Sequence, residues 1–305
     1  MVEYSRLRDW SLLLACNFIW SCYFVLVKLV QSQVGPIFAT VVPMLLAIVL
    51  LVPIVHRQLR ARVGGPVRLS SRDIRDFVLI GVFGQVVTQL LGAWGTRLSL
   101  ASNGALIALT APVSTAAMAH FLLGERMTRL RWASFGVAIV GVLECSGIDW
   151  RGLDLSSRTF LVGNLMLFVS VLGSAFYNAY SKRLLRRRLP LEVLLYSYYA
   201  AGAFMLPIGV YLEPHFFRDI PHFTSVVWLG FALLTIFHYF LSMVIFLNVL
   251  TRVDAIPVGL SNYLIPFFGL IVAAIVLHER LTKFMIVGGV LVLASTLLAT
   301  VYEER

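Results

Sequence analysis

The sequence carries a stripe of polar side chains at helical spacing within an otherwise apolar segment. Its members lie three, four or seven residues apart and include two amides and two hydroxyls: Gly81, Gln85, Thr88, Gln89, Gly92 and Thr96. Residues at this spacing share one face of an α-helix. Because a polar side chain that faces lipid is unfavourable, the stripe predicts a polar cavity or a contact with another helix.

Similar stripes occur in other apolar segments, and those of the second half correspond to those of the first. A shift of 154 residues places Gln85 on Tyr239 and Thr88 on Ser242, so both halves offer hydrogen-bonding groups on equivalent faces. We expect substrate contacts from ten residues of these stripes: Asn17, Trp20, Gln85, Thr88, Gln89, Tyr177, Asn178, His238, Tyr239 and Ser242. The alternative interpretation is that such residues only hold neighbouring helices together.

Three ionisable side chains lie within or beside these segments. His238 is near the middle of its segment, with no charged residue close to it in sequence. It is either a substrate or proton-coupling residue, or a buried histidine bonded to a neighbour. Lys28 and Lys182 are related by the same shift. Each either extends its ammonium group toward a membrane surface or contacts an anionic substrate, and the sequence leaves both interpretations open.

The composition requires a membrane environment. The 305 residues are 59% hydrophobic and 13% charged, with a mean hydropathy of +0.88, whereas soluble domains carry about 25% charged residues. A soluble globule is therefore excluded. The net charge of +10 does not indicate nucleic-acid binding, because the basic residues form short clusters between apolar segments, as expected for a membrane topology.

Apolar stretches of about 20 residues predict an all-α membrane protein with ten transmembrane helices. The expected spans are 10–30, 36–55, 76–97, 101–123, 131–148, 160–181, 191–212, 224–249, 254–277 and 282–301. Lys and Arg are concentrated in segments 56–75 and 182–192, which the positive-inside rule places in the cytoplasm. We therefore expect a multi-pass protein of the cell (inner) membrane with both termini in the cytoplasm.

The chain contains an internal repeat. The 154-residue shift also superposes Tyr23 and Lys28 on Tyr177 and Lys182. It places a proline, a glutamate and a threonine of the first half, Pro112, Glu125 and Thr128, on Pro266, Glu279 and Thr282 of the second. Residues 1–150 and 158–305 then hold five spans each. Because five is odd, the second copy enters the membrane from the opposite side, and such inverted repeats permit alternating access to a central cavity.

Two pairs of repeated residues are expected to affect conformational change or stability. Pro112 and Pro266 interrupt helix hydrogen bonding, so we expect their spans to bend during transport. Glu125 and Glu279 follow equivalent spans and lie beside arginines. This placement favours a structural ion pair or helix-start interaction at the turn, and a gating role is the alternative.

Several of these residues carry a family resemblance. The segments Leu-Ala-Ser-Asn-Gly-Ala-Leu at 100–106, Ala-Pro-Val at 111–113 and Leu-Gly-Glu-Arg-Met-Thr at 123–128 resemble the EamA repeat of the drug/metabolite transporter superfamily. The second half repeats the pattern at Pro266 and at Leu-His-Glu-Arg-Leu-Thr, residues 277–282, although His278 replaces the usual glycine. The resemblance covers essentially the whole chain. It implies a ten-span transporter, and most members of this family export or exchange amino acids and other small metabolites.

The sequence thus predicts a transporter rather than an enzyme. It has no HExxH or GxSxG motif and no paired carboxylates within a span, and we expect neither a metal nor a cofactor. The expected cavity is neutral, aromatic and rich in hydroxyls, which suits an amphipathic or amino-acid-like metabolite moved outward. The alternatives are facilitative uptake, exchange of another metabolite class, or a sensor of the same fold. The expected partners are the substrate and the lipid bilayer, and the plan allows a homodimer.

Overall fold

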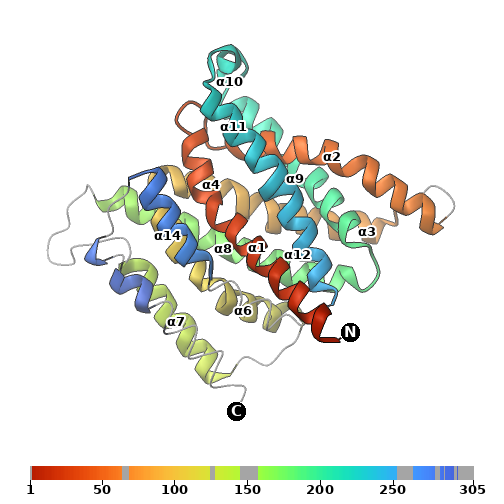
Figure 1. Cartoon of the computed structure of the whole chain (residues 1–305), viewed down its shortest axis with the longest axis horizontal. Helices are drawn as coiled ribbons and strands as arrows, with labels where there is room; N and C mark the ends of the chain where they lie inside the picture. The colour runs from red at the N-terminus through yellow and green to blue at the C-terminus, as the bar shows by residue number, and fades with distance from the viewer. Residues whose placement is uncertain are drawn as a thin grey trace.

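The protein is a bundle of packed helices (Figure 1). The computed structural model describes residues 2–63, 69–123, 128–144, 157–252, 264–278, 282–284, 286–291 and 294. Every element in these ranges is helical, which confirms the expected all-α class. The first half contains α1 (Val2–Val30), α2 (Phe38–Val63), α3 (Ser71–Leu79), η1 (Ile80–Val86), α4 (Val87–Leu98), α5 (Ala101–Ile107), η2 (Ala108–Thr110), α6 (Ala111–Leu123) and α7 (Arg129–Glu144).

The second half follows a corresponding order. It contains α8 (Ser157–Leu185), α9 (Pro190–Leu212), α10 (Phe216–Asp219), η3 (Ile220–His222), α11 (Ser225–Leu233), η4 (Leu234–Ser242), α12 (Met243–Leu250) and α14 (Leu264–Val276). The consecutive elements α3, η1 and α4 form one continuous span, and so do α11, η4 and α12. These two spans carry the polar stripes around Gln85 and His238.

Six helices in the described part of the chain are long and apolar enough to cross a membrane. They cover Ser11–Val30, Phe38–Ala61, Ser71–Leu98, Arg158–Leu185, Pro190–Leu212 and Ser225–Leu250. A seventh is obtained if the bent pair Ala101–Thr110 and Val113–Leu122 is one span. The other three expected spans, 131–148, 254–277 and 282–301, extend outside the described residues, so the count of ten stays a prediction.

Two spans contain a wider, π-helical section. These sections are η1 and η4, and the 154-residue shift that relates the two halves carries residues 80–86 onto 234–240. A π-helical turn alters which side chains lie on the inner face and is common at functional sites. Gln85 lies in η1, whereas His238, Tyr239 and Ser242 lie in η4.

The fourth span bends where proline interrupts it. Its two parts, Ala101–Thr110 and Val113–Leu122, meet at 48°, and the 3-10 turn η2 precedes Pro112. Proline lacks the backbone N–H that would continue the helical hydrogen bonds. Pro266 lies in α14. The bend lies where the sequence predicts that Pro112 interrupts the helix. Bending of this span during transport stays a prediction.

The halves contact one another in a reciprocal pattern. Helix α1 packs against η4 and α14, and α8, its counterpart under the shift, packs against η1 and α6. Helices α2 and α9, which also correspond, pack against each other. Helices α4 and α8 approach each other closely, so that a Cβ placed on Gly95 would lie 2.7 Å from the Gly163 carbonyl oxygen. Small residues at this contact let the two backbones approach, as is typical of membrane helix pairs.

We expect Gly95→Val to destabilise the bundle, because the added side chain forces α4 away from α8. Overpacking of this kind costs roughly 1–3 kcal/mol. The melting temperature of the purified protein in detergent measures the effect. Gly136→Val in α7 is the matched control, since no described atom lies within 4 Å of a Cβ built there. Equal melting temperatures for the two variants would contradict the assigned helix contact.

Candidate functional site

A cavity of about 150 Å³ lies inside the bundle and draws its walls from both halves of the chain. In the same measure, one water molecule needs roughly 10–15 Å³, so the space admits a small organic molecule. The lining residues are Trp20, Tyr23, Phe24, Gln85, Thr88, Gln89, Ala108, Ala111, Ser170, Val171, Ser174, Tyr177, Asn178, His238, Met243, Phe246 and Ile265.

Seven of the ten residues predicted to contact substrate line this cavity: Trp20, Gln85, Thr88, Gln89, Tyr177, Asn178 and His238. The other three, Asn17, Tyr239 and Ser242, are fully buried in the helices around it. The structure therefore brings the residues of the sequence stripes together around one space. Substrate contact itself stays a prediction for all ten.

Gln89 is the centre of a hydrogen-bond network that joins three spans. Its Oε1 accepts hydrogen bonds from the hydroxyls of Tyr23, at 3.2 Å, and Tyr239, at 2.8 Å. Its Nε2 donates to Gln85 Oε1 at 3.4 Å. Tyr239 is held in turn by Tyr198 of α9, whose hydroxyl donates to the Tyr239 carbonyl oxygen at 2.9 Å. These contacts fix the Gln89 side chain at the cavity wall.

His238 presents its ring to the cavity between two tyrosines. The ring stacks on Tyr23 with centroids 4.4 Å apart and meets the edge of Tyr239 at 4.9 Å. Its Nδ1 is buried and has no hydrogen-bond partner within the described residues. The Thr88 hydroxyl, also on the cavity wall, lacks a partner in the same sense. Buried polar atoms are normally paired, so these two atoms have unused hydrogen-bonding capacity in residues that line the cavity.

Equivalent hydrogen bonds flank the cavity in the two halves. Ser170 donates to the Thr88 carbonyl oxygen at 2.6 Å, and Cys16 donates through sulfur to the Ser242 carbonyl oxygen at 3.5 Å. The 154-residue shift exchanges these two pairs. Trp20 Nε1 also donates to Ser242 Oγ at 3.0 Å. Ser242 thus orients the Trp20 ring from behind the cavity wall.

The polar and the apolar lining residues come largely from different helices, and we call these two groups the polar wall and the apolar wall. The polar wall comes from η1, α4 and α8 and carries Gln85, Thr88, Gln89, Ser170, Ser174 and Asn178. The apolar wall comes mainly from α1, α12 and α14 and carries Trp20, Phe24, Met243, Phe246 and Ile265. No Lys, Arg, Asp or Glu is among the described lining residues. The site therefore suits a molecule with a polar end and an apolar end.

Several lining residues were not among the predicted contacts. Tyr23 is the repeat counterpart of Tyr177, a relation that could have identified it. Phe24, Met243, Phe246 and Ile265 are apolar residues in apolar helices, so no sequence signal separates them from lipid-facing or core residues. Met243 occupies the position equivalent to Gln89, and repeat equivalence could have identified it as well.

The other predicted residues lie elsewhere. Lys28 donates to the carbonyl oxygens of Thr96, at 3.0 Å, and Ser99, and so binds the end of α4. Neither Lys28 nor Lys182 lines the cavity. Glu125 and Glu279 lie outside the described residues. Within the described residues, no group of three or more His, Cys, Asp or Glu could hold a metal ion.

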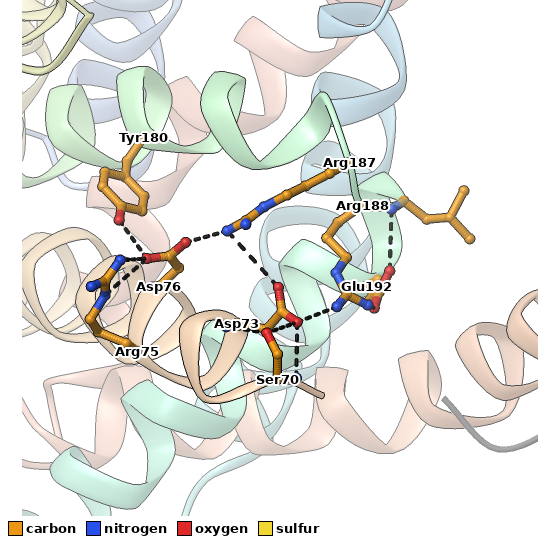
Figure 2. Close-up of polar contacts among 9 residues, drawn as sticks. Ser70, Asp73, Arg75, Asp76, Tyr180, Arg187, Arg188 and Glu192 are labelled. Carbon is orange, nitrogen blue, oxygen red and sulfur yellow. Dashed lines mark hydrogen bonds and ion pairs between the residues drawn. The ribbon is translucent and has the colours of Figure 1, made fainter. Parts of the chain in front are cut away.

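An ionic cluster joins the two halves at one end of the bundle. Figure 2 shows Arg187 and Arg188, from the turn between α8 and α9, reaching Asp73 and Asp76 near the start of α3. Both carboxylates are buried, with 5% and 2% exposure. Tyr180 also donates to Asp76 Oδ1 at 2.9 Å. The sequence pattern indicated only the membrane topology of these arginines, not their carboxylate partners.

Further contacts hold each charged group of this cluster in place. Ser70 donates to Asp73 Oδ2 through its hydroxyl at 2.6 Å and caps α3 by accepting from the Asp73 backbone N–H. Arg188 Nη1 also binds Glu192 Oε1 at 2.7 Å. Burial lowers the pKa of Arg188, but Glu192 and Asp73 outweigh this effect and raise the pKa above its ordinary value. Arg188 is therefore a permanent cation in the cluster.

Comparisons with known proteins agree with this architecture. The chain matches the family model described as EamA-like transporter family over residues 10–145 and 161–301. It is 29% identical to a "Probable terminal-alkyne amino-acid exporter" from Streptantibioticus cattleyicolor, over 76% of this chain and 74% of the relative. It is 25% identical to "Uncharacterized transporter YcxC" from Bacillus subtilis, over 79% and 78%. A crystal structure shares the fold with a TM-score of 0.66 and 15% identity, covering 98% of both chains.

We expect Asp76→Asn to lower the stability of the protein, because the substitution removes the nearer carboxylate of Arg187 while keeping the side-chain volume, and leaves only Asp73 Oδ1 at 3.9 Å. A hydrogen bond to a charged group is worth roughly 1.5–3 kcal/mol. Thermal unfolding in detergent measures the loss. Arg75→Gln is the control, because the Arg75 side chain is 64% exposed and exposed ion pairs contribute only about 0–1 kcal/mol. An Arg75 variant that is less stable than the Asp76 variant would overturn this ranking.

Proposed function

The chain belongs to the EamA-like transporter family, and from that premise we propose that it exports a small amphipathic, amino-acid-like metabolite across the inner membrane. One observation carries the proposal: a neutral cavity with one polar and one apolar wall, built from both halves inside a bundle of membrane helices. A molecule with both kinds of surface satisfies the two walls together. Facilitative uptake, exchange of another metabolite class, and sensing without transport are the competing functions.

Two further points support export of this substrate class. The relative from Streptantibioticus cattleyicolor is named as an amino-acid exporter. The cavity also offers amide and hydroxyl groups for a polar head group, and Trp20, Phe24 and Phe246 for an apolar side chain. Ligand sites commonly combine a mostly apolar lining with a few placed polar groups.

We further propose alternating access between inverted repeats, residues 1–150 and 158–305. Both ends of the bundle carry links between the halves. The end near the chain's N-terminus, expected in the cytoplasm, carries the cluster of Asp73, Asp76, Arg187 and Arg188. A separate ion pair at the same end, Arg252–Asp9, links the halves at 3.0 Å. Exposure of the cavity on this side requires these ionic links to separate.

The opposite end is held by different contacts. Glu213 accepts hydrogen bonds from the backbone N–H groups of Ile37, at 2.8 Å, and Phe38, at 3.0 Å. Gln33 Oε1 accepts from the backbone N–H and the hydroxyl of Thr224. Opening toward this side requires these bonds to break, while the ionic cluster keeps the other end closed. Pro112 and Pro266 are the proposed bending points, and Glu125 and Glu279 the proposed structural residues, for this exchange.

Counterflow in liposomes tests the proposed function. The purified protein is reconstituted with an internal panel of unlabelled metabolites, led by amino acids, and uptake of the labelled compound is measured with and without a pH gradient. Saturable exchange of an amino-acid-like compound is expected. Exchange confined to a different class would favour another substrate, and no exchange by folded protein would favour a sensor.

We expect His238→Ala to reduce substrate exchange, because the substitution removes the ring that stacks on Tyr23 and the unpartnered Nδ1 at the cavity wall. The loss of one hydrogen bond and a stacking contact corresponds to roughly a tenfold rise in KM. His56→Ala is the control, because His56 is exposed on α2. Unchanged exchange kinetics in the His238 variant would remove this residue from the site.

A further inference from the structure

We propose that the amide pair Gln85 and Gln89 is the head-group subsite of the cavity and binds the carboxylate of a zwitterionic amino acid. The inference rests on the proposed function and adds the chemistry and orientation of the substrate. It rests on the hydrogen bonds around Gln89, which occupy its amide oxygen and leave N–H donors for a bound molecule.

The Gln89 amide presents donors to the cavity because its acceptor is already occupied. Oε1 receives two hydroxyl protons, from Tyr23 and Tyr239, which matches the two lone pairs of an amide oxygen. The amide nitrogen carries two hydrogens, and Nε2 gives one of them to Gln85 Oε1. The second hydrogen remains for a bound molecule.

Gln85 and Thr88 extend this donor surface. Because Gln85 Oε1 accepts from Gln89, the amide nitrogen of Gln85 is the part of that group left to act as a donor. The Thr88 hydroxyl, one turn from Gln85 on the same wall, has no partner within the described residues. Three neighbouring groups that can donate hydrogen bonds fit a carboxylate, which is acceptor-only when ionised.

The neutral lining selects a zwitterion over a simple anion. No described lining residue carries a cationic side chain, and an uncompensated carboxylate in a low-dielectric site is strongly unfavourable. An amino acid brings its own ammonium group next to the carboxylate. The head group then enters the cavity with no net charge, and neutral amide donors suffice to hold it.

The substrate's orientation follows from differences between the repeats. The positions equivalent to Gln85 and Gln89 in the second half are Tyr239 and Met243, so the amide pair occurs once. Likewise, Trp20 and Phe24 of the apolar wall correspond to Ser174 and Asn178 of the polar wall. The head group therefore binds beside η1 and α4, and the apolar side chain points toward Met243, Phe246 and Ile265.

Ligand-induced thermal stabilisation of the purified protein tests this subsite without relying on transport. The probes are L-leucine, isopentylamine, which lacks the carboxylate, and 4-methylpentanoate, which lacks the ammonium group. For the wild type we expect stabilisation by L-leucine that exceeds both analogues. Gln89→Glu keeps the acceptor for both tyrosines but replaces the N–H donors with oxygen. Its affinity for L-leucine is expected to fall about tenfold or more, and its affinity for isopentylamine to rise.

A second variant and a control keep the test decisive. Gln89→Met introduces the residue found at the equivalent position, Met243, and is expected to lose L-leucine binding without gaining isopentylamine binding. Gln31→Glu is the control, because Gln31 donates to the Ala93 carbonyl oxygen away from the cavity; it should bind all three probes as the wild type does. Wild-type affinity for L-leucine in both Gln89 variants would overturn the subsite. A wild type that prefers isopentylamine would overturn the carboxylate assignment while leaving transport, measured by counterflow, in place.

Discussion

Polar groups inside an apolar bundle must find partners on neighbouring helices, and this requirement determines how the centre of the protein is built. A buried polar atom without a partner is unfavourable, because lipid tails offer no hydrogen bond to replace the one lost from water. Gln89 meets the requirement by linking α1 and η4 through Tyr23 and Tyr239, and Tyr198 extends the chain to α9. Because the network crosses both halves, the same bonds that satisfy these side chains also set the shape of the cavity wall.

Close helix packing complements this network. Glycines at the α4–α8 contact let the two backbones approach, and this brings the Ser170 hydroxyl within 2.6 Å of the Thr88 carbonyl oxygen. The wide turns of η1 and η4 occur at equivalent positions in the two halves. The backbone thus follows the internal repeat, whereas the side chains on it differ, and that difference separates the polar wall from the apolar wall.

The sequence was sufficient to find most of the polar lining of the cavity, but it could not find most of the apolar lining. The stripe from Gly81 to Thr96 stands out because amides are rare and periodic in an apolar helix, and its members Gln85, Thr88 and Gln89 line the cavity. Phe246 and Ile265 carry no such contrast. The partners of Arg187 and Arg188 were also beyond prediction, because Asp73 and Asp76 lie more than a hundred residues away and only folding brings them together.

The distribution of charge follows from the same physics. Among the described residues, the ion pairs between the halves lie at the end of the bundle near the N-terminus, where one or both partners remain partly accessible to water. An ion pair at the cavity would be hydrated whenever the cavity opened to water, and it would have to be desolvated again each time a substrate bound. Amide and hydroxyl groups would avoid that cost under the proposed function, since they would bind a polar head group by hydrogen bonds and return to their protein partners or to water when it departs. A neutral cavity, with these ion pairs confined to one end of the bundle, therefore suits the proposed function, in which a substrate must be held weakly enough to be released.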